Sequence, residues 1–111
     1  MTEVQAGERP DVAVLRIEGR LTMVNAPALR ASVGEAVEAG RTTVVIDLAA
    51  CTFMDSSGLG AIVGGLKAAR QAGGDLRIAR LTPQVRTVLE LTNLDRVLRP
   101  HDTVEAALDG G

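Results

Sequence analysis

The sequence predicts a single α/β domain over residues 1–111, and three observations lead to this class. Segments rich in β-branched residues alternate with segments whose apolar residues recur at helical spacing. Strands that alternate with helices are joined by crossover connections, which are typical of parallel or mixed sheets. A chain of this length, with 46% hydrophobic residues, is long enough to form one core. Because Phe53 is the only aromatic residue, that core must be aliphatic.

Two strands are predicted near the N-terminus. A turn over residues 7–11, marked by Pro10, separates a short edge strand from a longer segment. β-Branched residues recur through residues 12–18, which predicts a strand, and Gly19 is expected to end it.

A helix is predicted over residues 26–39, where four apolar side chains form one stripe: Leu29, Val33, Ala36 and Val37. Asn25 can serve as its N-cap, and Gly40 is well placed to end it. The nearly continuous β-branched run over residues 42–48 is typical of a central strand that is covered on both faces.

A turn over residues 49–54 is expected to lead into a second helix, from about residue 57 to residue 71. Gly73 and Gly74 end this helix. Five apolar residues form its inner face: Leu59, Ile62, Val63, Leu66 and Ala69. The alternation over residues 76–81 predicts the next strand.

The last third of the chain predicts two more helices. Thr82 is expected to cap the first, which Asn93 ends and which buries Val85, Val88 and Leu89. A short strand over residues 97–99 and a final helix over residues 103–108, capped by Asp102, complete the domain.

Composition and charge exclude several classes of protein. With a net charge of −2 and one aromatic residue, the chain has neither the basic excess nor the stacking platforms that nucleic-acid binding requires. The single cysteine, Cys51, indicates a reducing compartment and reads as a small buried hydrophobe. The longest apolar or glycine run, residues 59–66, is too short to cross a bilayer, and no signal peptide begins the chain. We therefore expect a cytoplasmic domain without membrane insertion.

Residue patterns for enzymatic chemistry are missing. The residues around Ser56 and Ser57 lack the two flanking glycines of a nucleophile elbow. His101, the only histidine, is expected on a solvated loop far along the chain from these serines. One cysteine and one histidine give no metal-ligand spacing, and the glycines match neither a dinucleotide fingerprint nor a P-loop. We therefore predict no catalytic residue, no cofactor and no metal.

The run Asp55-Ser56-Ser57-Gly58 lies where a strand is followed by a helix, and two interpretations remain open. In the first, Ser56 or Ser57 is simply the N-cap of the helix. In the second, the hydroxyl groups accept a phosphoryl group, which would face free N–H donors and the positive end of the helix dipole. Phosphorylation would add about −1.5 to −2 charges to a small surface, which suits a switch that a partner reads.

Residues 53–60, FMDSSGLG, resemble the signature of bacterial anti-sigma factor antagonists, the stand-alone STAS domains. The resemblance covers nearly the whole chain, because residues 19–21 fit the family's Gly-x-Leu turn and residues 44–48 fit the strand before the signature. Residues 73–74, 82–85 and 91–94 match later elements. It implies a mixed four- to five-stranded sheet, with about four helices packed mainly on one side.

The resemblance also implies a partner-switching function in transcription regulation. Family members bind an anti-sigma factor that is a serine kinase with a histidine-kinase-like ATPase fold, and so release a sigma factor. The kinase switches them off by phosphorylating the first serine of the signature, here Ser56, and a metal-dependent phosphatase of the PP2C type reverses this. Asp55 and Ser57 would flank the acceptor, and Gly58 would keep the helix start open.

One residue departs from the family pattern. Where the family usually carries an acidic residue after Gly-x-Leu, this chain has Thr22, which changes the charge that a kinase would read. The docking face is expected to combine the signature with this loop: Ser56, Ser57, Leu59, Thr22, Met23 and Val24. A constitutive STAS adaptor, such as a subunit of a lipid-transport ATPase, is the main alternative. A nucleotide-binding or weakly hydrolytic domain is a third reading, which lacks a supporting lysine or metal ligand.

Overall fold

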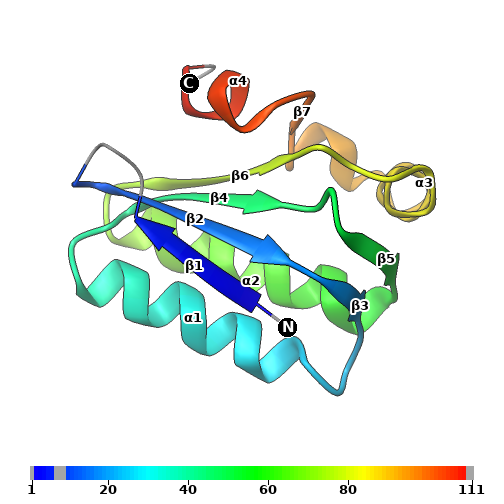
Figure 1. The fold of residues 1–111 in the computed structure, drawn as a ribbon, viewed down its shortest axis with the longest axis horizontal. Coiled ribbons are helices and arrows are strands. Elements are labelled where there is room, and N and C mark those ends of the chain that lie inside the picture. The colour runs from blue at the N-terminus through cyan, green and yellow to red at the C-terminus, as the bar shows by residue number, and fades with distance from the viewer. Residues whose placement is uncertain (1, 7–9, 110–111) are drawn as a thin grey trace.

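A mixed five-stranded sheet forms the centre of the computed structural model, which describes residues 2–6 and 10–109 (Figure 1). The outer strand β1 pairs antiparallel with β2, and the other neighbouring strands pair in parallel. Across the sheet the order is β1 (Thr2–Ala6), β2 (Val12–Ile17), β4 (Thr43–Asp47), β6 (Asp75–Ala79) and β7 (Pro100–His101). The edge strand, the long second strand and the central strand are therefore confirmed. Residues 7–9 of the predicted N-terminal turn lie outside the described part of the chain.

A second, two-stranded parallel sheet continues from one end of the first. It pairs β3 (Gly19–Leu21) with β5 (Cys51–Met54). β2 does end before Gly19, as predicted, but the sequence did not predict β3, and residues 51–54 of the predicted turn form a strand instead. Gly19 turns the chain at φ +77°, and its N–H donates to the carbonyl of Ala50 at 2.9 Å. The chain after β2 and the chain after β4 therefore leave the main sheet together and keep pairing.

The described residues form four α-helices, which pack against the sheets. α1 (Ala26–Glu38) and α2 (Ser56–Gln71) lie side by side on one face of the main sheet, and the large aliphatic core lies beneath them (Figure 1). α3 (Pro83–Leu91) packs at the end of the molecule against β5. Among the described elements, the short α4 (Val104–Asp109) alone covers the opposite face, over a small cluster that includes Val12, Val45 and Ala107. The predicted fold class, with helices mainly on one side, is confirmed.

The predicted helix stops hold, and so do two of the three predicted cap positions. Gly40 and Gly73 both adopt φ +86° just after their helices. Asn25 and Thr82 occupy the N-cap positions of α1 and α3 without a side-chain hydrogen bond to the helix. In α4 the cap is Thr103, whose Oγ1 accepts from the N–H of Ala106 at 3.0 Å, and not Asp102.

The segment after α3 also differs from expectation. A short 3₁₀ helix, η1 (Leu94–Arg96), precedes an extended stretch, and the last strand is Pro100–His101 rather than residues 97–99. His101 therefore lies in a strand and is half-buried, not on a solvated loop. None of the described helices is both long enough and apolar enough to span a bilayer.

Candidate functional site

Asp55 is the N-cap of α2, and neither serine is. The Asp55 carboxylate accepts from the N–H of Gly58 at 2.8 Å, and its own N–H donates to the carbonyl of Leu21 at 3.2 Å. Asp55 has extended backbone angles, as an N-cap should, and Ser56 is the first residue of the helix. The interpretation of Ser56 or Ser57 as the cap is therefore wrong.

Since Asp55 caps the helix, the Ser56 hydroxyl has no structural task. Ser56 is exposed, and no group in the described ranges forms a hydrogen bond with its hydroxyl. The first helical hydrogen bond at this end runs from the N–H of Leu59 to the carbonyl of Asp55. The N–H groups of Ser56 and Ser57 thus lack a helical acceptor and point out of the helix at its positive end. An anion attached at Ser56 would meet these donors.

Gly58 permits a close approach between α2 and β3. A Cβ atom on Gly58 would lie 2.4 Å from the carbonyl oxygen of Leu21 and 2.8 Å from its Cγ. The expectation that Gly58 keeps the helix start open is therefore wrong, because the space is filled by Leu21. Leu59 is only 4% exposed and belongs to the core. Gly58 and Leu59 hold the helix in place from beneath and do not form part of the exposed surface.

The loop between β3 and α1 presents two apolar side chains next to this helix start. Met23 is 72% exposed and Val24 is 87% exposed. Leu21 pairs with Met54 in the small sheet, so Thr22 follows at the level of Asp55. We call the set formed by the exposed Met23, Val24 and Ser56 with the half-buried Thr22 and Ser57 the Ser56 surface. The structure thus brings together the loop and signature residues that the sequence indicated, apart from the two buried ones.

Internal hydrogen bonds fix the loop while its apolar side chains project. The N–H of Thr22 donates to Oδ1 of Asn25 at 2.7 Å, and Nδ2 of Asn25 donates to the carbonyl of Arg20. The Thr22 hydroxyl accepts from the N–H of Val24 at 3.4 Å. Asn25 therefore closes the loop on itself, which explains why it does not cap α1.

Sequence reasoning missed the residues that hold β5 from its other side. Gln84 binds both main-chain groups of Met54: its Oε1 accepts from the N–H at 2.9 Å and its Nε2 donates to the carbonyl at 3.1 Å. The Thr82 hydroxyl donates to the carbonyl of Cys51 at 3.2 Å. These side chains tie α3 to the strand that ends at Asp55. The Thr-Pro-Gln-Val run was visible in the sequence, but nothing there indicated this contact.

Cys51 is buried beneath the site, as predicted. Burial raises the pKa of the Cys51 thiol above its ordinary value of 9.0, and smaller backbone contributions at Phe53 and Leu21 lower it only in part. The thiol therefore stays protonated at neutral pH and is a poor nucleophile.

Taken together, an α/β scaffold presents an exposed serine and two exposed apolar side chains on the loop and helix start that follow β3 and β5. Residues 3–107 match the STAS domain family, and the chain belongs to that family.

Similar proteins are named as anti-sigma factor antagonists. The anti-sigma-F factor antagonist RsfB of Mycobacterium tuberculosis is 33% identical over 96% of this chain and 87% of its own length. The crystal structure of a putative anti-sigma factor antagonist from Thermotoga maritima superposes with a TM-score of 0.88 at 28% identity, covering 98% of this chain and 92% of that one. The antagonist SpoIIAA, solved in its unphosphorylated form, gives a TM-score of 0.83 at 25% identity, covering 98% and 94%.

Proposed function

We propose that this chain is a non-enzymatic anti-sigma factor antagonist whose binding to an anti-sigma factor is switched off by phosphorylation of Ser56. The observation that carries the proposal is that Asp55, and not Ser56, caps α2. Asp55 satisfies the helix end, so the Ser56 hydroxyl is exposed and unengaged among the described residues. The names of the similar proteins support the antagonist function.

The Ser56 surface is suited to contact with a protein. Met23 and Val24 offer apolar area, and the unbranched Met23 can adapt its shape to a partner. The serines lie beside them and add little bulk. The partner is proposed to be a serine kinase with a histidine-kinase-like ATPase fold, and a PP2C-type phosphatase is proposed to restore the free hydroxyl.

A phosphate on Ser56 changes the surface without requiring a change of fold. The orphan N–H groups and the dipole of α2 favour the phosphate, whereas the neighbouring Asp55 carboxylate repels it. Because that carboxylate is held by the N–H of Gly58, the added charge is directed outward. About −2 charges among the apolar contacts would oppose binding by several kcal/mol, enough to dissociate a complex.

Thr22 leaves the position beside the proposed acceptor uncharged. Its hydroxyl accepts a hydrogen bond within the loop, a role that an aspartate carboxylate can also perform. We therefore expect Thr22→Asp to keep the loop conformation and to alter only the charge facing the kinase. The expected result is a changed phosphorylation rate with an unchanged unfolding midpoint, measured on the same preparation.

The proposal is tested by incubating the protein with ATP and each candidate anti-sigma kinase, followed by intact mass measurement and fragment mapping. We expect one phosphate, on Ser56, and a loss of kinase binding once it is attached. Ser56→Ala should bind but resist switching, and the matched variant Ser57→Ala should still be phosphorylated at Ser56. Phosphorylation of Ser56→Ala at the wild-type rate would refute the assignment. Stable binding without any phosphate would instead favour the constitutive adaptor.

A further inference from the structure

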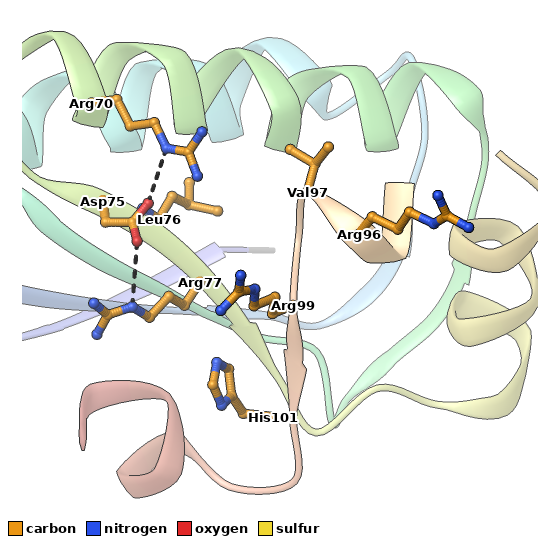
Figure 2. Close-up of a pocket in the computed structure, with 8 residues that line it drawn as sticks. All are labelled: Arg70, Asp75, Leu76, Arg77, Arg96, Val97, Arg99 and His101. Carbon is orange, nitrogen blue, oxygen red and sulfur yellow. Dashed lines mark hydrogen bonds and ion pairs between the residues drawn. The ribbon is translucent and has the colours of Figure 1, made fainter. Parts of the chain in front are cut away.

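A pocket of about 420 Å³ lies beside Arg70 in the last turn of α2 (Figure 2), whereas Ser56 begins that helix. Fourteen residues of helix separate Ser56 from Arg70 at the pocket, a distance of about 20 Å at the usual rise per residue. The pocket is thus distinct from the Ser56 surface. Its lining is Arg70, Asp75, Leu76, Arg77, Arg96, Val97, Arg99 and His101.

The pocket exists because the last strand is short. β7 pairs only with Ile78 and Ala79, so in the described part of the chain residues 75–77 of β6 have no strand beside them on that edge. The end of α2 and the segment that follows η1 form the remaining walls (Figure 2). The missing strand pairing therefore leaves a hollow and not a closed sheet edge.

The lining is strongly basic although the whole chain has a net charge of −2: four arginines meet one aspartate. Asp75 holds two of them, with Nε of Arg70 at 3.3 Å and Nε of Arg77 at 3.6 Å from its carboxylate oxygens. Arg77 also donates to the carbonyl of Ala107 at 2.8 Å. These contacts fix the two side chains in place at one wall of the pocket.

The opposite wall carries Arg99 and His101, whose side chains have no such partner among the described residues. Arg99 and His101 are two residues apart on an extended segment, so they share a side, and Figure 2 shows both projecting toward β6. No hydrogen bond or ion pair engages the Arg99 side chain within the described residues. Figure 2 shows the Arg96 guanidinium turned toward α3, so Arg96 contributes its stem and a more distant charge.

We propose that this pocket binds a small anion that carries two or more phosphate groups. Guanidinium groups recognise phosphate through paired hydrogen bonds, and only Leu76 and Val97 provide apolar contact. The volume falls within the range of about 300–1,000 Å³ that small-molecule sites have, which exceeds the needs of one phosphate ion. Asp75 supplies one negative charge against the two positive charges of Arg70 and Arg77, so one anionic group of the ligand can face that wall while another faces Arg99 and the nearby His101.

Isothermal titration calorimetry with inorganic pyrophosphate at constant ionic strength tests this proposal, since the chain has no tryptophan for a fluorescence assay. Wild type is expected to bind saturably, and Arg99→Gln to bind about tenfold more weakly or worse. The matched control Arg30→Gln removes an exposed charge from α1 and should change the affinity less than twofold. Because Arg99 is exposed, its replacement does not threaten folding.

Three results would overturn the proposal. The first is the absence of saturable pyrophosphate binding by wild type. The second is an equal loss of affinity in Arg99→Gln and Arg30→Gln, which would indicate attraction to overall charge. The third is binding of orthophosphate as tight as that of pyrophosphate, which would remove the need for two phosphate groups. None of these outcomes depends on Ser56 or on a sigma-factor pathway.

Discussion

Gly58→Ala should destabilise the domain even though alanine is the better helix former. The added Cβ would lie 2.4 Å from the carbonyl oxygen of Leu21, 2.8 Å from its Cγ and 3.0 Å from its carbonyl carbon. That oxygen also accepts the N–H of Asp55, so moving it away strains the cap of α2. Overpacking of this kind lowers the free energy of unfolding by about 1–3 kcal/mol, while the higher helix propensity of alanine raises it by about 0.5–1 kcal/mol. We expect a net loss of about 1–2 kcal/mol.

Gly60→Ala is the matched control, two residues further along the same helix. Gly60 is exposed, and nothing lies within 4 Å of the position of its Cβ. Gly60→Ala therefore changes only the helix propensity, and we expect the free energy of unfolding to rise by about 0.5–1 kcal/mol. Urea denaturation followed by helical circular dichroism measures both variants. If Gly58→Ala proved as stable as Gly60→Ala, the contact between α2 and Leu21 would not be the constraint described above.

Two further predictions concern the helix cap and the buried thiol. Asp55→Ala removes the acceptor for the N–H of Gly58 and should lower the unfolding free energy by about 1 kcal/mol. Asp55→Asn keeps a side-chain oxygen as acceptor and should retain most of the wild-type stability. Equal urea midpoints for the two variants would contradict this prediction. Cys51, whose pKa is raised by burial, should resist iodoacetamide in the native protein at neutral pH and react once urea unfolds it, as intact mass measures. Because the pKa of the Cys51 thiol is raised in the folded protein, the thiol ionises at lower pH in the unfolded chain. The free energy of unfolding should therefore fall as the pH rises above the ordinary pKa of 9.0, and Cys51→Ala should not show this decline.

The elements that the sequence predicted best are those in which the pattern of apolar residues extends over many positions. The β-branched run that became β4 and the apolar stripes of α1 and α2 each carry their periodicity over enough residues to identify themselves. β3 and β5 have three and four residues, too few for a period to appear. They form because Gly19 turns the chain toward Ala50, which is a contact between distant segments.

Exposure and capping at the predicted site follow the sequence only in part. Ser56, Met23 and Val24 are exposed, whereas Gly58 and Leu59, which the signature also indicated, are buried. Which residue caps α2 depended on where the helix begins, and a shift of one residue exchanged the roles of Asp55 and Ser56. Gln84 binds Met54 across 30 positions of sequence, and no local pattern encodes such a contact.

Phe53 gives the molecule a natural reporter position. It is the only aromatic ring in the sequence, it lies three residues before Ser56 on β5, and the Arg20 guanidinium stacks 4.8 Å from its centroid. Fluorinated phenylalanine incorporated during expression would therefore give one fluorine resonance from a single, held environment. That resonance would follow a partner or a phosphate at the neighbouring helix start, and the tryptophan fluorescence of any partner could be recorded without a contribution from this chain.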